Sequence, residues 1–181
     1  MSTKHTTALL ATLGLLLSVS AARAGTARFD GQMKPLYREY RKIHGALASD
    51  SVKGVNVAAK QIARLAGKLN PSSVTGEHAG HYRSLPGAIK ASAVKLRRAR
   101  GIAAKRGAFK ELSRPLAMWA TMSRPAGIKV YYCSMVRGSW LQSDRKTANP
   151  YYGARMLGCG EVVAGADRGA GSRTERQGHA R

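Results

Sequence analysis

The segment DSVKGVNVAAKQIARLAGKLNP, residues 50–71, decides the fold class. Its apolar side chains recur three or four residues apart, which is the spacing of one face of an α-helix. Asp50 and Ser51 precede them with side-chain oxygens that suit a helix N-cap, and Asn70-Pro71 ends the pattern. We therefore expect an amphipathic helix here, with its buried face formed by Val52, Val55, Ala59, Ile62, Ala66 and Leu69.

Three further segments have the apolar spacing of a helix, one before this segment in the sequence and two after it. The first covers residues 36–47, the next begins at Pro86 and runs to about residue 96, and the last covers residues 109–119. Residues 72–85 are rich in Ser, Gly and His and are predicted to form a loop. Pro115 requires the last helix to begin late or to bend. The fold class is therefore mainly α, an antiparallel bundle of about four helices.

The period changes after residue 127. Residues 128–133 are β-branched and aromatic, and residues 139–142 can pair with them as a hairpin. The sequence NPYYG at residues 149–153 has turn composition, and residues 154–157 are expected to form a short helical turn. We therefore expect a small C-terminal β-hairpin followed by a sulfur-containing loop.

The N-terminus resembles a secretory signal. Residues 1–24 combine Lys4, an apolar run too short to span a bilayer, and the small-x-small sequence Ala22-Arg23-Ala24. We expect cleavage near Ala24-Gly25, a location in the periplasm or outside the cell, and no later transmembrane segment. Residues 25–34 are predicted to be a flexible leader, residues 35–163 a single domain, and residues 164–181 a disordered basic tail.

The chain is strongly basic, with 31 Lys and Arg against 9 Asp and Glu, and a net charge of +22. Such a surface attracts anionic partners at low salt. The basic run at residues 95–100 has no interleaved aromatic side chains, so it does not favour specific nucleic-acid binding. Paired carboxylates, nucleophile motifs and a phosphate-binding loop are missing from the sequence, which does not favour an enzyme.

Four sulfur-bearing residues are the main functional candidates: Cys133, Met135, Met156 and Cys159. Thiolate and thioether ligands select soft ions such as Cu(I) or Ag(I). Residues two apart on a strand, or three apart on a helical turn, share a face, so each pair can present two sulfurs together. A disulfide between Cys133 and Cys159 is the alternative, since an oxidising compartment favours it. The two states can also interconvert, because metal binding requires the reduced thiolates.

His78 and His81 are a weaker second metal candidate in the predicted loop. Imidazole is a common ligand for zinc and other transition metals. Two histidines in a polar loop are more often simply solvated, so they stand behind the sulfur residues as candidates.

The C-terminal motifs resemble a known family. YCSM at residues 132–135, NPYYG at 149–153 and MLGCG at 156–160 look like the signature of a small exported domain of unknown function. That domain occurs alone, and also fused to the C-terminus of periplasmic adaptor subunits of copper and silver efflux systems. The resemblance covers about residues 36–163, and Arg106, Phe109, Leu112 and Ser113 match the helix that precedes the sulfur segment. The family's first motif is usually Cys-Pro-Met, whereas this chain has Ser134 in the middle.

The resemblance implies an exported helical domain associated with copper, with the four sulfur residues at the matching donor positions. The leading hypothesis is therefore a Cu(I) or Ag(I) module that sequesters the ion or passes it to a periplasmic efflux adaptor. The alternative is a disulfide-stapled interaction domain whose basic surface docks on an anionic partner or surface.

Overall fold

In the computed structural model, residues 6–144 and 146–165 are described, with side chains described from residue 25 onward. Four helices come first: α1 (Thr6–Ala48), α2 (Val55–Ala66), α3 (Ala79–Arg98) and α4 (Gly101–Ser123). The strands β1 (Lys129–Cys133), β2 (Gly138–Gln142) and β3 (Glu161–Ala164) follow, with a 3-10 turn η1 (Gly153–Met156) before the last strand. The predicted mainly α fold, four helices followed by strands, is confirmed.

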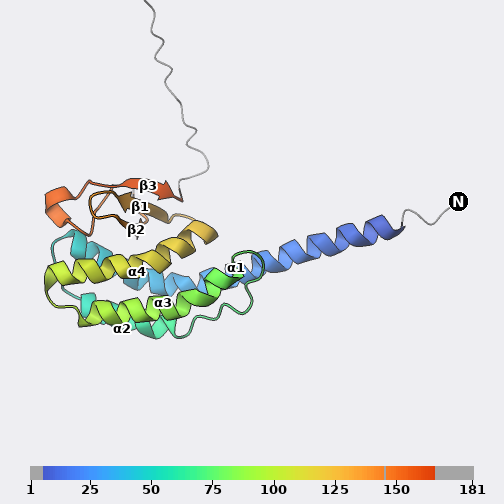
Figure 1. Cartoon of the computed structure of the whole chain (residues 1–181), viewed down its shortest axis with the longest axis horizontal. Coiled ribbons are helices and arrows are strands. Elements are labelled where there is room, and N and C mark those ends of the chain that lie inside the picture. Colours follow the sequence, from blue (N-terminus) through green and yellow to red (C-terminus); the bar gives the residue numbers. More distant parts are fainter. Residues whose placement is uncertain (1–5, 145, 166–181) are drawn as a thin grey trace, which may run out of the picture.

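The helices pack in sequence order, α1 against α2, α2 against α3 and α3 against α4. The sheet lies on one side of the helices, where β2 packs against α4 (Figure 1). The apolar positions that predicted the helices form the core, and among the most deeply buried are Leu36, Ile43, Ile62, Ile89, Leu112 and Leu116. Val52 is the exception, because α2 begins only at Val55, after Gly54, and leaves Val52 exposed.

The expected flexible leader at residues 25–34 is instead part of α1. Phe29 and Met33 are fully buried, and they extend the apolar face of Leu36 by steps of three and four residues. Asp30 accepts hydrogen bonds from the indole Nε1 of Trp119, at 2.8 Å, and from the hydroxyl of Ser123. The segment is helical because these contacts with α4 stabilise it, a contribution that local sequence composition does not reveal.

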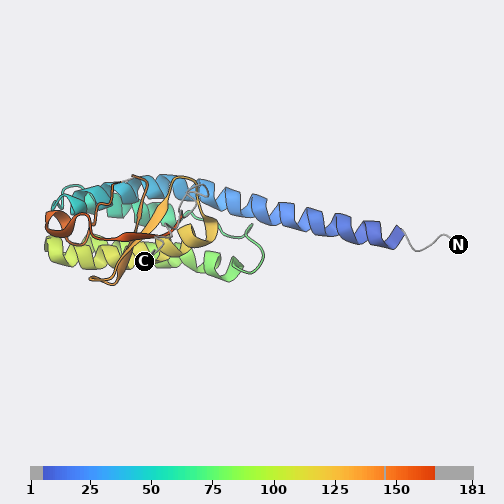
Figure 2. The same cartoon turned by 90° about the horizontal axis from the view of Figure 1, so that it is seen from above.

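Helix α1 extends well beyond the other helices towards its N-terminus (Figure 2). The projecting part includes residues 6–24, which belong to the predicted signal segment. Gly25 is buried, and a β-carbon there would overlap the backbone carbonyl of Ser73. Within the described residues, no helix combines the length and apolar character needed to cross a membrane.

Helix α3 begins earlier than predicted, at Ala79 rather than at Pro86. The second half of the predicted loop, residues 79–85, is therefore helical, and Tyr82 and Leu85 in it are buried. Pro86 lies inside α3, and Pro115 lies inside α4. Proline in a helix interior removes a hydrogen bond, and here the buried apolar face of each helix offsets that cost.

The sheet has the order β2-β1-β3 and is antiparallel throughout. The predicted hairpin is confirmed, with Tyr131 opposite Trp140. Strand β3 was not predicted, and it pairs with the other edge of β1, where Glu161 lies opposite Tyr132. Only Val162 and Val163 signal a strand in that stretch, which is too short a β-branched run to identify from sequence alone. Ala164, expected to begin the tail, ends this strand, and residues 166–181 of the predicted tail lie outside the described residues.

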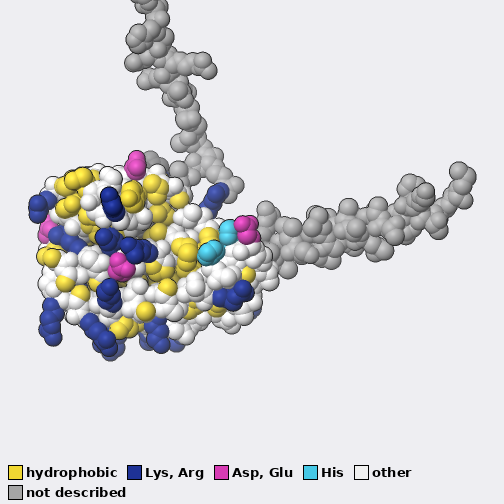
Figure 3. All heavy atoms as spheres, viewed as in Figure 1, with side chains coloured by type: hydrophobic (Ala, Val, Ile, Leu, Met, Phe, Trp, Pro, Cys, Tyr) yellow, Lys and Arg dark blue, Asp and Glu magenta, His cyan; other side chains and the backbone are white. Residues whose placement is uncertain are grey.

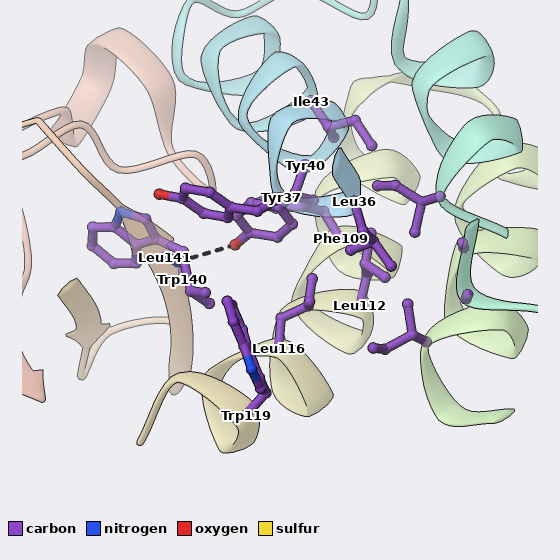
Figure 4. Packing of buried hydrophobic residues seen from close by; sticks show 14 of the residues in the cluster. Leu36, Tyr37, Tyr40, Ile43, Phe109, Leu112, Leu116, Trp119, Trp140 and Leu141 are labelled. Atoms are coloured by element: carbon purple, nitrogen blue, oxygen red, sulfur yellow. Dashed lines mark hydrogen bonds between the residues drawn. The ribbon is translucent and has the colours of Figure 1, made fainter. Parts of the chain in front are cut away.

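Tyr40 joins the helices to the sheet (Figure 4). Its buried hydroxyl accepts a hydrogen bond from the backbone N–H of Leu141 in β2, at 3.1 Å, and lies 2.8 Å from the hydroxyl of Ser113 in α4. Its ring stacks on Phe109 with 4.9 Å between centroids. One side chain of α1 therefore fixes the position of both α4 and β2, and through β2 the position of β1.

Candidate thiol site

Cys133 and Cys159 come together because β1 and β3 are neighbours. Cys133 is the last residue of β1, and Cys159 lies two residues before β3 begins. Their Sγ atoms are 3.1 Å apart, and both are free thiols. A disulfide bond is about 2.05 Å long, so the two sulfurs are in close contact without being bonded. Cys133 is buried, whereas Cys159 is half-buried.

The loop before Cys159 is organised by Asn149, which is fully buried. Its amide Nδ2 donates to the carbonyl of Cys159 at 2.9 Å, and its Oδ1 accepts from the backbone N–H of Tyr151 at 2.8 Å. Its own backbone N–H donates to the carbonyl of Leu157 at 2.8 Å. Asn149 therefore closes the loop that carries Cys159 and sets where that cysteine meets β1.

Arg106 of α4 fastens the same loop to the helices. Its guanidinium donates to the carbonyls of Pro150, at 3.0 Å, and Leu47, at 2.8 Å. It also forms an ion pair with Asp50 at 2.6 Å, and the other oxygen of Asp50 accepts from the backbone N–H of Ala154 at 2.9 Å. These bonds hold the 149–154 turn against the C-terminal end of α1.

The two thiols have opposite electrostatic environments. Burial opposes ionisation of Cys133, but hydrogen bonds from the Cys159 thiol, from the backbone N–H groups of Val136 and Met135, and from Asn149 outweigh it and lower the pKa of Cys133. The pKa of Cys159 is raised, first because its thiol donates to Cys133 and then by burial. Cys133 is thus the thiol of the pair that loses its proton first as the pH rises, and Cys159 the second.

A surface pocket of about 240 Å³ opens onto the pair. Its lining comprises Tyr132, Cys133, Ser134, Cys159, Gly160 and Glu161. Gly160 has a φ of 139°, and a β-carbon there would overlap the ring of Trp140. Glycine at this position therefore allows the backbone beside Cys159 to approach the indole closely.

Comparison with known proteins identifies the helical part of the chain. Residues 36–125 match a family described as a protein of unknown function, DUF3347. The chain contains a DUF3347 domain. No curated protein and no solved structure matches the chain. The matched region runs from the last third of α1 to just past the end of α4, so the DUF3347 match ends before both cysteines.

The two methionines lie apart from this pocket, since neither is among its lining residues. Met135 is in the turn between β1 and β2 and is 65% exposed. Met156 is half-buried at the end of η1. The structure therefore brings together two of the four predicted sulfur donors and leaves the two thioethers outside the pocket.

The other metal candidate is the pair His78 and His81. These residues are distant in sequence from the cysteines and lie at the start of α3, in the DUF3347 domain. Both side chains are exposed, and their ring centroids are 6.3 Å apart. Over the described ranges 6–144 and 146–165, no group of three His, Cys, Asp or Glu side chains is arranged to hold a metal ion. These histidines thus form a pair without a third such ligand beside them.

Sequence reasoning missed Asn149 and Asp50 as residues of the site. Asn149 appeared only as a turn residue, and Asp50 only as a helix cap. Asp50 has a left-handed φ of 54°, and Arg106 approaches it across 56 residues of chain. Only the resemblance to the family drew attention to Arg106, because it matches a position in the helix that precedes the sulfur segment. The side-chain contacts that give these residues their importance depend on the tertiary fold.

Proposed function

We propose that this chain is an exported module that binds a soft monovalent ion, Cu(I) or Ag(I), through Cys133 and Cys159. The observation that carries the proposal is the contact of the two Sγ atoms, 3.1 Å apart, at a pocket open to the surface. Thiolates prefer soft, polarizable cations. Four hydrogen-bonding groups around Cys133 favour its thiolate form, so one ligand is prepared for the ion.

Binding requires only a small movement of the pair. With metal–sulfur bonds of about 2.3 Å, as for zinc thiolates, a tetrahedral angle places two sulfurs roughly 3.8 Å apart. The sulfurs must then separate by about 0.7 Å from their 3.1 Å contact. Cys159 lies outside the strands and is the freer of the two, because Cys133 is held in the centre strand of the sheet.

Met135 and Met156 are the proposed thioether ligands. Each is close in sequence to one cysteine. Thioethers, like thiolates, are soft ligands that select Cu(I). Met135 is largely exposed, so rotation of its side chain towards Cys133 breaks no core packing. The four residues Cys133, Met135, Met156 and Cys159 form the complete donor set in this proposal.

The role that follows is sequestration of the ion, or its transfer to a periplasmic adaptor subunit of a copper or silver efflux system. Two features support this assignment. The first is the N-terminal segment, which has the pattern of a secretory signal. The second is the resemblance of the sulfur motifs to the domain found fused to such adaptors.

A second candidate is a disulfide-stapled interaction domain, which the same contact favours. Oxidation of the two thiols forms the Cys133–Cys159 bond and releases two protons and two electrons to an external oxidant. Closing a loop of this length stabilises the fold by roughly 3.5 kcal/mol in the chain-entropy model. In that case the module acts through its surface instead of a metal.

The test is native mass spectrometry of the purified chain, first untreated and then fully reduced and titrated with Cu(I) without oxygen. We expect the reduced protein to retain one copper against a competing chelator. The variant Cys133→Ser/Cys159→Ser should retain none, while Ser134→Ala, which alters the same pocket without removing sulfur, should behave as wild type. An untreated mass lighter by two hydrogens, with no copper retained after reduction, would instead support the stapled domain.

A further inference from the structure

Helices α2 and α3 carry only positive charge. Neither contains an aspartate or glutamate, and the one acidic residue between them in sequence is Glu77. Their basic residues are Lys60, Arg64, Arg83, Lys90, Lys95, Arg97 and Arg98. On the face seen in Figure 3, Lys and Arg side chains project along the lower edge, where α2 and α3 lie in Figure 1, and no acidic side chain is visible there.

The charges elsewhere in the molecule are partly neutralised. The ion pairs found in the described part of the chain are Arg41–Asp144, Lys42–Glu39, Arg106–Asp50 and Arg114–Glu111. None of them involves α2 or α3. Among the residues that the structure describes, no acidic side chain therefore neutralises the basic side chains of these helices. An anionic partner that binds there gains the electrostatic attraction of these charges.

Two shallow depressions flank α2 and share one residue, Val57. The depression towards α1 is about 370 Å³, and its lining includes Arg38 and Arg64 together with the ion pair of Lys42 and Glu39. The depression towards α3 is about 340 Å³ and is lined by Lys60, Arg97, Arg98, Asn56 and Val57. Val57 is 67% exposed. The exposed Val57 side chain thus lies between Arg38 and Arg64 on one side and Lys60, Arg97 and Arg98 on the other.

We propose that this surface docks the protein on an anionic lipid bilayer. We call it the α2 basic face, formed by Arg38, Lys60, Arg64, Arg97 and Arg98 around Val57. The cations contact the phosphate groups of the lipids, and Val57 enters the boundary between headgroups and acyl chains. Basic side chains around an apolar centre are the pattern of helices that lie on membrane surfaces.

The arrangement fits a lipid surface better than other anionic partners. The cations are spread over three helices and line two separate shallow depressions, so no single deep pocket collects them around one small anion. The only aromatic residue of α2 and α3 is Tyr82, which is buried, so the face offers no platform for stacking bases. One valine is also little apolar area for the centre of a protein–protein interface.

The experiment compares two triple variants that change the net charge equally. Lys60→Gln/Arg97→Gln/Arg98→Gln removes three of the five cations of the α2 basic face, and Arg124→Gln/Lys146→Gln/Arg155→Gln removes three exposed cations outside it. Sedimentation with phosphatidylglycerol-containing vesicles, and with neutral phosphatidylcholine vesicles as reference, measures binding. Each basic residue near an anionic membrane contributes about fivefold in affinity, so the first variant should bind roughly 100-fold more weakly. The second should lose less than about threefold.

A second pair of variants tests Val57 directly. Val57→Ser should weaken vesicle binding several-fold, whereas Val163→Ser, at an exposed valine of β3, should not. All these positions are exposed, so thermal unfolding should stay close to wild type. Equal weakening by both triple variants, or unchanged binding of Val57→Ser, would overturn the proposal. Tighter binding of the face to a soluble polyanion such as heparin than to the vesicles would also overturn it.

Discussion

The side-chain amide of Asn149 donates a hydrogen bond to the carbonyl oxygen of Cys159, with 2.9 Å between nitrogen and oxygen. Replacing Asn149 by Ala leaves the buried N–H of Tyr151 without its acceptor and the carbonyl of Cys159 without its donor. We expect the free energy of unfolding to fall by about 1–3 kcal/mol, the cost of unsatisfied buried groups. Urea denaturation measures this change. Asn70→Ala, which removes an exposed local hydrogen bond to Ser72, is the control and should have little effect.

The unequal thiols make a prediction about pH. Since the pKa of Cys133 is lowered and that of Cys159 is raised, the pair should ionise in two separate steps, one below and one above the usual thiol pKa. Carbon NMR of the labelled cysteine side chains follows both steps separately from tyrosine ionisation and without requiring solvent access to the buried sulfur. Cu(I) binding should begin with the first step, because metal ligation needs the thiolate.

Single variants assign these steps. Cys133→Ser should leave one step nearer the usual thiol pKa, because Cys159 loses the neighbouring sulfur whose contact raises its pKa. Asn149→Ala should move the first step to higher pH, because Cys133 loses one of its hydrogen-bond donors. Two coincident steps in the wild-type protein would contradict the inferred asymmetry.

Gly153 is the position where backbone conformation matters most for the loop. Its φ is 58°, and a β-carbon there would overlap the Asp50 carboxylate and the Arg106 guanidinium. Gly153→Ala should therefore cost about 1–2 kcal/mol for the left-handed conformation, and more for the disturbed ion pair. Gly158→Ala is the matched control, because a β-carbon at Gly158 meets nothing within 4 Å. Equal stability of the two variants would show that the 149–154 turn is not held against α1 as described.

Hydrophobic periodicity predicted the four helices and the hairpin because these elements bury one regular face. It failed at residues 25–34, where Gly25, Gly31 and charged residues surround the two buried side chains Phe29 and Met33. It also placed the start of α3 too late, since Pro86 resembles a first-turn residue but lies eight residues into the helix. In both places tertiary packing outweighs the local signal.

The sequence predicted which sulfur-bearing residues are candidates for the site, but it did not predict how they are arranged. The spacing of the sulfur residues suggested two pairs, each facing one way. The structure instead brings one sulfur from each pair into contact, through a third strand that the sequence did not reveal. The polar residues that support this contact, Asn149, Arg106 and Asp50, act across long sequence separations. Such contacts have no signature in a single sequence.

The N-terminal extension of the domain beyond the DUF3347 match should contribute to stability. Phe29 is fully buried, and its ring meets Tyr82 edge-on with 5.1 Å between centroids. Phe29→Ala should lower the free energy of unfolding by about 3–5 kcal/mol, the usual cost of removing a buried phenyl ring. Arg28→Ala, at an exposed neighbour, should change it by less than about 0.5 kcal/mol. A chain starting at residue 36 should be similarly destabilised in thermal unfolding, whereas one starting at Gly25 should not.

The two methionines separate a two-thiolate site from a four-sulfur site. Met135→Leu/Met156→Leu keeps side-chain volume and apolar character, so unfolding should change by less than about 1.5 kcal/mol. If both thioethers ligate the ion, competition against a Cu(I) chelator should show a clear loss of affinity in the double variant. Met118→Leu/Met122→Leu in α4 removes two thioethers from the helical part of the molecule and should bind as wild type.

The exposure of the two residues predicts unequal effects. Met135 is 65% exposed and has no packing to lose, so any loss of affinity from Met135→Leu alone reports ligation. Met156 is half-buried, and its single variant needs the unfolding measurement beside it. If the double variant binds Cu(I) as tightly as wild type, the thioether part of the proposal is wrong. The ion is then held by the sulfurs of Cys133 and Cys159 alone.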